Sequence, residues 1–183
     1  MDNRISSIIK RALNVTAGYI TAFILTFVLS SAVFFIARSD TPQVMPWVSF
    51  FIFLILFYNV YTQMHSIGVK ENRPQYHINP SAFKGLLYGV IGVIPILLVQ
   101  VIVLAIPVSE QFAVFRWRIF QLVSGPLYWL ARLLGNMPRH YFLSLVSIII
   151  IAFLGYLAGH YRFYLSTWLI QTFGTKKNKR TQP

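Results

Sequence analysis

The sequence predicts an all-α integral membrane protein with about four transmembrane helices and additional amphipathic interfacial helices. Its 183 residues are 56% hydrophobic and only 11% charged, whereas soluble domains carry roughly 25% charged residues. Residues 12–37 contain no charge, and about 20 apolar residues are enough to cross a hydrocarbon core roughly 30 Å thick. The length predicts one membrane domain over residues 1–183.

The first two spans are predicted over residues 12–37 and 46–66. Residues 1–11 place isoleucines at helical spacing against basic residues, which predicts a short amphipathic segment on the inner membrane surface. A cleaved signal peptide is the alternative for the first span, because residues 30–32 are small. The apolar run continues past them, which favours a retained anchor.

The second half of the chain adds two further spans, over residues 85–107 and 141–161. A cytoplasmic loop is predicted over residues 67–84, because Pro74 and Pro80 forbid a continuous helix there. Residues 174–183 form a basic tail that is expected to attract anionic lipid.

Residues 110–138 are predicted to lie along the outer face as two short interfacial helices and not to cross the membrane, and a re-entrant segment is the alternative that fits the same length. Charged residues interrupt this segment, and its longest uncharged run, residues 119–131, is too short for a span. Its apolar residues share one helical face, and Gly125 and Pro126 should divide the helix in two. Arg116 lies on the apolar face and is the exception.

Basic residues predict the orientation. If the amino terminus is inside, eleven of the 16 Lys and Arg residues face the cytoplasm, as the positive-inside rule requires. We therefore expect a multi-pass protein of a bacterial plasma membrane with both termini cytoplasmic. The net charge of +12 comes from residues at the ends of apolar runs, so it indicates contact with anionic lipids and not with nucleic acid.

Small residues recur four positions apart in three of the predicted spans, which allows close helix approach in lipid. The stripes serve either packing inside one chain or an interface with a protein partner or a second copy. The candidate helix-packing residues are Gly18, Ala22, Gly85, Gly89, Gly155 and Gly159.

Asn59, Gln63 and Gln100 are the candidate polar residues inside the membrane. They are expected to form hydrogen bonds between helices or to line a substrate cavity. No Asp, Glu, Lys or Arg is placed deep in a predicted span, which disfavours an ion-driven transporter.

The predicted cytoplasmic loop offers a polar surface, interpreted either as a solvated loop or as a docking or ligand-contact surface. No metal or cofactor is expected, because the histidines do not match a familiar ligand spacing and the chain has no cysteine. The candidate residues at the loop are His65, Lys70, Glu71, Asn72, Arg73 and His77.

The run from Gly68 to Pro95 resembles a segment of small multi-pass membrane proteins of Gram-positive bacteria to which no activity is assigned. In that segment a Gly, Lys, acid and Asn/Arg cluster precedes a Lys-Gly-helix-Gly-Pro pattern. The resemblance implies a bacterial plasma membrane and four spans. The matching positions are Gly68, Lys70, Glu71, Asn72, Lys84, Gly85, Gly89 and Pro95.

These features favour a non-catalytic membrane subunit or assembly protein that acts through helix–helix contacts. The alternative is a small-molecule permease or the substrate-binding membrane component of a larger transporter. A membrane enzyme is a third class, which would need Glu71 together with His65 or His77 for acid–base chemistry. An enzyme is the less favoured reading.

Overall fold

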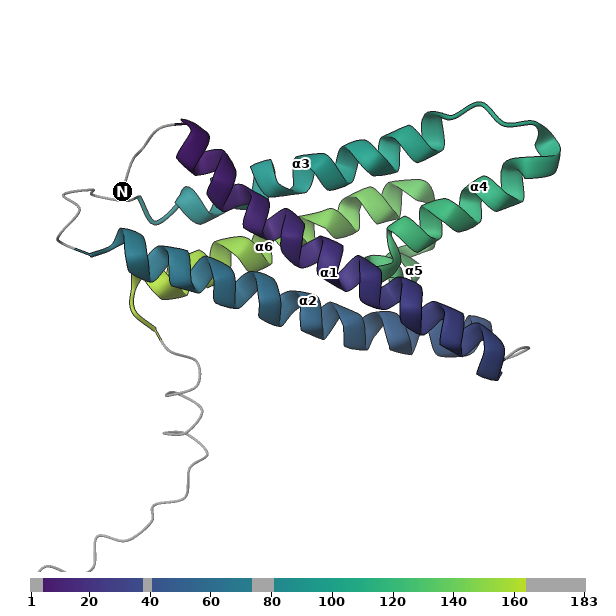
Figure 1. Ribbon diagram of the computed structural model, residues 1–183, viewed down its shortest axis with the longest axis horizontal. Coiled ribbons are helices and arrows are strands. Elements are labelled where there is room, and N and C mark those ends of the chain that lie inside the picture. Colours follow the sequence, from purple (N-terminus) through teal and green to yellow (C-terminus); the bar gives the residue numbers. More distant parts are fainter. Residues whose placement is uncertain (1–4, 38–40, 74–80, 164–183) are drawn as a thin grey trace, which may run out of the picture.

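The computed structural model describes residues 5–37, 41–73 and 81–163, and in these ranges the chain is helical with no strand (Figure 1). The predicted all-helical class is confirmed. The elements are α1 (Ile5–Ala37), α2 (Thr41–Glu71), α3 (Lys84–Ala105), α4 (Glu110–Val123), the 3-10 turn η3 (Gly125–Leu127), α5 (Tyr128–Leu134) and α6 (Pro138–His160).

Four of these helices, α1, α2, α3 and α6, are long and apolar enough to cross a membrane, and they indicate a multi-pass membrane protein. Helix α6 packs against α2 and α3, and α1 crosses diagonally over α2 and α3. The chain leaves α3 at one end of this bundle and returns toward it through α4 (Figure 1).

The core lies where the four long helices face each other. On α2 the buried positions Ile52, Leu56, Val60 and Met64 recur every four residues, so one helical stripe faces the core. The opposite faces carry large exposed apolar residues such as Phe51 and Leu98. That distribution suits a bundle surrounded by lipid, because lipid solvates apolar side chains.

Two helices are longer than the sequence pattern predicts. The expected surface segment 1–11 is not separate over its described part, because Ile5 already begins α1 and residues 5–17 contain no Pro or Gly. Helix α2 continues to Glu71, whereas the loop was expected from residue 67. The first proline after α2 is Pro74, so nothing in the sequence stops the helix earlier.

The segment after α3 forms two short helices that are divided at Gly125 and Pro126, as predicted. However, the middle of the segment does not lie on the surface, because all four residues from Ser124 to Leu127 are buried. Tyr19 of α1 donates a hydrogen bond to the Val123 carbonyl at 2.8 Å, and Ser49 of α2 donates one to the Gly125 carbonyl at 2.7 Å. These bonds hold the turn inside the bundle, and we call residues 124–127 the re-entrant turn because of this inward path.

Arg116, the exception on the apolar face of α4, has a clear position. Its Nη1 atom donates to the carbonyls of Leu104 at 3.3 Å and Ile106 at 3.0 Å. The last carbonyls of a helix have no partner within that helix. Arg116 therefore closes the end of α3 and fastens α4 to it.

Candidate functional site

Glu71 lies at the centre of a buried charged cluster that joins all four long helices. Its Oε1 atom accepts hydrogen bonds from Arg11 Nη1 of α1 and from the Tyr88 hydroxyl of α3 at 2.6 Å. Its Oε2 atom accepts from the Tyr156 hydroxyl of α6 at 2.8 Å, and Lys84 Nζ lies 3.8 Å from Oε2. We call these five residues the Glu71 cluster.

The local sequence explains how the Glu71 cluster forms. Lys84 and Tyr88 are four residues apart on α3, so they lie on one face of the helix. Glycines bring α6 close: an added Cβ at Gly85 would lie 2.5 Å from the Tyr156 Cβ, and one at Gly68 would lie 2.5 Å from the Tyr156 carbonyl oxygen. The glycines therefore allow α6 to approach closely enough for the Tyr156 hydroxyl to reach Glu71.

Burial determines what the Glu71 cluster can do. The Glu71 side chain is 0% exposed, and the Arg11 side chain is 11% exposed. A buried carboxylate is tolerated only when it is paired and hydrogen-bonded, and here both oxygens accept hydrogen bonds. A general base needs an oxygen within reach of a substrate proton. The closed geometry favours a role in holding the helices together over a role in acid–base chemistry.

His65, one of the two histidines proposed at the loop, contacts other groups in the structure. His65 stacks on Tyr61, and its Nε2 atom lies 2.9 Å from the Phe163 carbonyl. Asn72 donates instead to the His160 carbonyl at 2.5 Å. Lys70 and Arg73 are exposed, and His77 lies outside the described residues. Within the described ranges, no three His, Asp or Glu residues group together as a metal site would require.

The structure places the candidate small residues at contacts inside the chain. An added Cβ at Gly155 of α6 would lie 2.7 Å from the Tyr61 carbonyl oxygen of α2, and one at Gly89 of α3 would lie 3.0 Å from the Ile149 Cα of α6. Gly18 faces Val60, Gly85 faces Tyr156, Gly159 faces His65, and Ala22 is fully buried.

A neutral polar layer lies farther along the bundle, around the re-entrant turn. Gln100 of α3 is fully buried, and its Nε2 atom donates to Ser124 Oγ at 3.0 Å. In α3, Pro95 cannot donate to the Ile91 carbonyl, and Thr16 of α1 donates to the adjacent Gly92 carbonyl at 2.7 Å. The interhelical hydrogen bond expected for Gln100 is therefore present, and its partner is the re-entrant segment.

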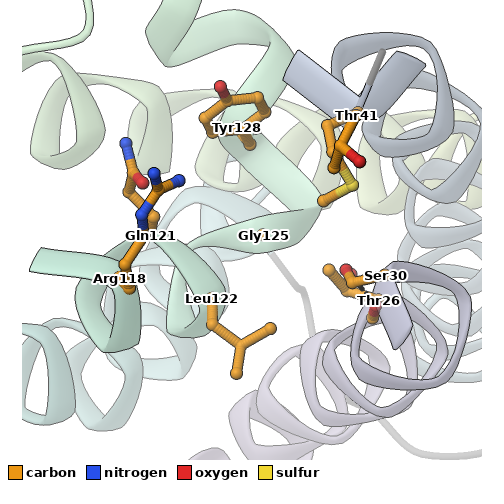
Figure 2. A pocket seen from close by; sticks show the side chains of 9 residues that line it. Thr26, Ser30, Thr41, Arg118, Gln121, Leu122, Gly125 and Tyr128 are labelled. Carbon is orange, nitrogen blue, oxygen red and sulfur yellow. Dashed lines mark hydrogen bonds between the residues drawn. The ribbon is translucent and has the colours of Figure 1, made fainter. Parts of the chain in front are cut away.

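A small pocket opens beside the re-entrant turn, where α4 faces α1 (Figure 2). Its volume is about 200 Å³. Figure 2 shows Arg118 and Gln121 side by side on α4, with Thr26 and Ser30 of α1 across from them. We call this the Arg118 pocket. Its lining residues are Thr26, Ser30, Thr41, Met45, Arg118, Gln121, Leu122, Gly125 and Tyr128.

A shallow groove of about 430 Å³ runs between α1 and α2 on the half of the bundle that holds the Glu71 cluster. Its lining includes the amides of Asn14 and Gln63, which form no hydrogen bond with any described residue. On α2 the polar face continues to Asn59, whose amide likewise has no partner in the described ranges. We call this surface the polar groove, and its lining residues are Asn14, Ala17, Thr62, Gln63, Ser66, Ile67 and Lys70.

The sequence analysis identified Glu71 but assigned it to a cytoplasmic loop, and it did not identify Arg11, Lys84, Tyr88 or Tyr156 as its partners. One signal was available, because Glu71 is one of only four acidic residues against 16 basic ones. An isolated acid beside two apolar spans is a candidate for pairing. Arg11 and Glu71 lie just outside the predicted spans 12–37 and 46–66, and the structure buries both of them within α1 and α2.

Comparison with known proteins adds no family. No protein-family model, no curated protein and no solved structure matches this chain.

Proposed function

We propose that this protein is a non-catalytic membrane subunit or assembly protein that docks a transmembrane helix of a partner protein, or of a second copy, in the polar groove. The observation that carries the proposal is a row of polar side chains on an outward face of α2. Residues 59, 62, 63, 66 and 70 are Asn, Thr, Gln, Ser and Lys, and their spacing places them on one helical face.

The depth of this row in the membrane would make amides without hydrogen-bond partners costly in free energy. Helix α2 has 31 residues, so it is about 46 Å long, compared with a hydrocarbon core of about 30 Å. Asn59 lies twelve residues, about 18 Å, from the Glu71 end, so a centred α2 would hold it inside that core. An amide without a hydrogen-bond partner in an apolar medium costs roughly 2–7 kcal/mol. A docked helix that carries polar side chains would remove much of that cost.

The closed state of the Glu71 cluster supports a non-catalytic role. Its carboxylate already accepts three hydrogen bonds, from Arg11, Tyr88 and Tyr156. The small-residue stripes also leave little space along the bundle axis, because their glycines contact neighbouring helices directly. A permease needs a route for its substrate through that axis. The Arg118 pocket favours the alternative, a substrate-binding component of a larger transporter.

The proposed setting is a bacterial plasma membrane with both termini in the cytoplasm. The positive-inside rule supports this orientation, which places Lys10, Lys70 and Lys84 at the inner surface. Anionic lipids would surround that end. The four apolar helices are the structural support for a multi-pass arrangement.

A photocrosslinking amino acid tests the docking proposal in native membranes. We expect the photoreactive group at Gln63 to give a discrete product of higher mass. The same group at Ile94, an exposed apolar residue of α3, should give only lipid adducts. Mass spectrometry of the product then distinguishes a second copy from a different protein.

The substitution Asn59→Leu supplies the functional half of the test. It removes the amide that lies deepest in the proposed interface, so the crosslinked product from position 63 should fall several-fold while the folded protein remains. The proposal fails if positions 63 and 94 give the same products, or if position 63 gives none.

A further inference from the structure

Arg118 is a cation without a counter-charge in the described part of the chain. No hydrogen bond or ion pair joins it to another described residue. The described acids are Glu71, which is engaged in the Glu71 cluster, and Glu110, which lies eight residues earlier on α4, about 12 Å by helical rise. The Arg118 pocket therefore has an electropositive side.

The opposite side of the pocket offers hydrogen-bond acceptors. Thr26 donates its hydroxyl proton to the Ala22 carbonyl at 2.8 Å, and Ser30 donates its proton to the Thr26 carbonyl at 2.5 Å. Both protons point back into α1, so the lone pairs of these oxygens are free to accept. A complementary ligand would carry a negative charge toward Arg118 and a hydrogen-bond donor toward α1.

The volume of the Arg118 pocket and its membrane setting limit the class of ligand further. At about 200 Å³ the pocket is smaller than the 300–1,000 Å³ typical of sites for drug-sized molecules, so it fits a headgroup-sized group. Four apolar helices indicate a membrane setting, and the common anion of phospholipids is a phosphate ester. An arginine fork matches phosphate geometry in a bidentate manner.

We propose that the Arg118 pocket binds a phosphate ester that also carries a hydroxyl or ammonium donor, either as the headgroup of a phospholipid or as a free small phosphate ester. Arg118 holds the phosphate together with the Gln121 amide, whose Nε2 atom also donates to the Tyr141 hydroxyl at 3.5 Å. Ser30 and Thr26 accept from the donor. This site is independent of the polar groove, so it does not depend on the proposed partner.

Binding to defined lipids tests the site. The purified chain is placed in nanodiscs of phosphatidylcholine that contain a small fraction of phosphatidylglycerol, and bound lipid is counted by native mass spectrometry. Phosphatidylcholine has the phosphate but no hydrogen-bond donor, so phosphatidylglycerol should be retained preferentially. Glycerol phosphate, added to the detergent-solubilised protein in a thermal-shift assay, tests the free form.

Three variants make the result specific. Arg118→Gln should weaken retention of phosphatidylglycerol about tenfold or more, because it removes a charge-assisted hydrogen bond. Arg139→Gln removes the same charge from an exposed position at the start of α6 and should change retention less than twofold. Ser30→Ala should reduce the preference for phosphatidylglycerol over phosphatidylcholine.

The outcomes distinguish a lipid ligand from a free phosphate ester, and each of them supports or overturns the proposed site. An effect of Arg118→Gln that is seen with phosphatidylglycerol alone assigns the site to lipid, and one seen with glycerol phosphate as well assigns it to the free ester. Equal retention of the two lipids together with no thermal shift from glycerol phosphate overturns the proposal, as does an equal loss in both arginine variants.

Discussion

The two ends of the bundle are held together by different chemistry. At one end the Glu71 cluster joins four helices through a buried ion pair and two tyrosine hydroxyls. At the other end the re-entrant turn is held by neutral bonds, such as Ser49 to the Gly125 carbonyl and Gln100 to Ser124. A buried charge is costly when its partner is lost, whereas a neutral hydrogen bond contributes only about 1 kcal/mol net. The charged end should therefore be the more sensitive to substitution, and the neutral end the more adaptable.

The largest expected effect comes from Glu71→Gln. This variant leaves Arg11 buried without its counter-charge, and breaking one partner of a buried ion pair costs about 3–5 kcal/mol. Thermal or denaturant unfolding in detergent would measure the loss. The matched control is Glu110→Gln at an exposed position, which should change stability by less than about 0.5 kcal/mol. Equal stability of the two variants would show that the ion pair is dispensable.

A smaller effect at the same end is expected from Gly85→Ala. The added methyl group would lie 2.5 Å from the Tyr156 Cβ, so α3 and α6 must separate and the hydrogen bond from Tyr156 to Glu71 must lengthen. Overpacking of this kind costs about 1–3 kcal/mol. Val90→Ala on the exposed face of α3 is the comparison variant. A Gly85→Ala protein as stable as the Val90→Ala protein would mean that the helices adjust without cost.

The smallest effect is expected at the neutral end, from Ser124→Ala. Gln100 would lose the acceptor of its Nε2 donor, and we expect a loss of about 1–2 kcal/mol. Hydrogen exchange should show faster opening confined to residues around the re-entrant turn, with the Glu71 cluster unchanged. Ser31→Ala, an exposed serine that bonds within its own helix, is the control. Exchange that rises equally at both ends would contradict the idea that the ends are independent.

Much of the architecture is local enough to read from sequence. The four long apolar stretches and the break at Gly125 and Pro126 depend on residues close together in the chain, and the structure has both. The ends of the helices were harder to predict from the sequence. Helix α2 continues past residue 66, and the signal for this is only that no proline lies between residue 66 and Pro74.

The Glu71 cluster could not be derived in this way. Arg11 and Glu71 are 60 residues apart, and Glu71 and Tyr156 are 85 apart, so their meeting depends on which helices become neighbours. Small-residue spacing showed that helices approach closely without showing which ones. The burial of the re-entrant turn could not be predicted for the same reason. It depends on hydrogen bonds from Tyr19 and Ser49, which are far from the turn in the sequence.

The Glu71 cluster also has a consequence for biosynthesis. Chains emerge from the amino terminus onward, so α1 and α2 precede α3 and α6 and already hold both members of the Arg11–Glu71 pair. Helix α3 then brings Lys84 and Tyr88, and α6 comes last with Tyr156. The carboxylate thus acquires its partners in the order in which the ribosome delivers them. No intermediate with two, three or four helices has to carry Glu71 without a positive charge beside it.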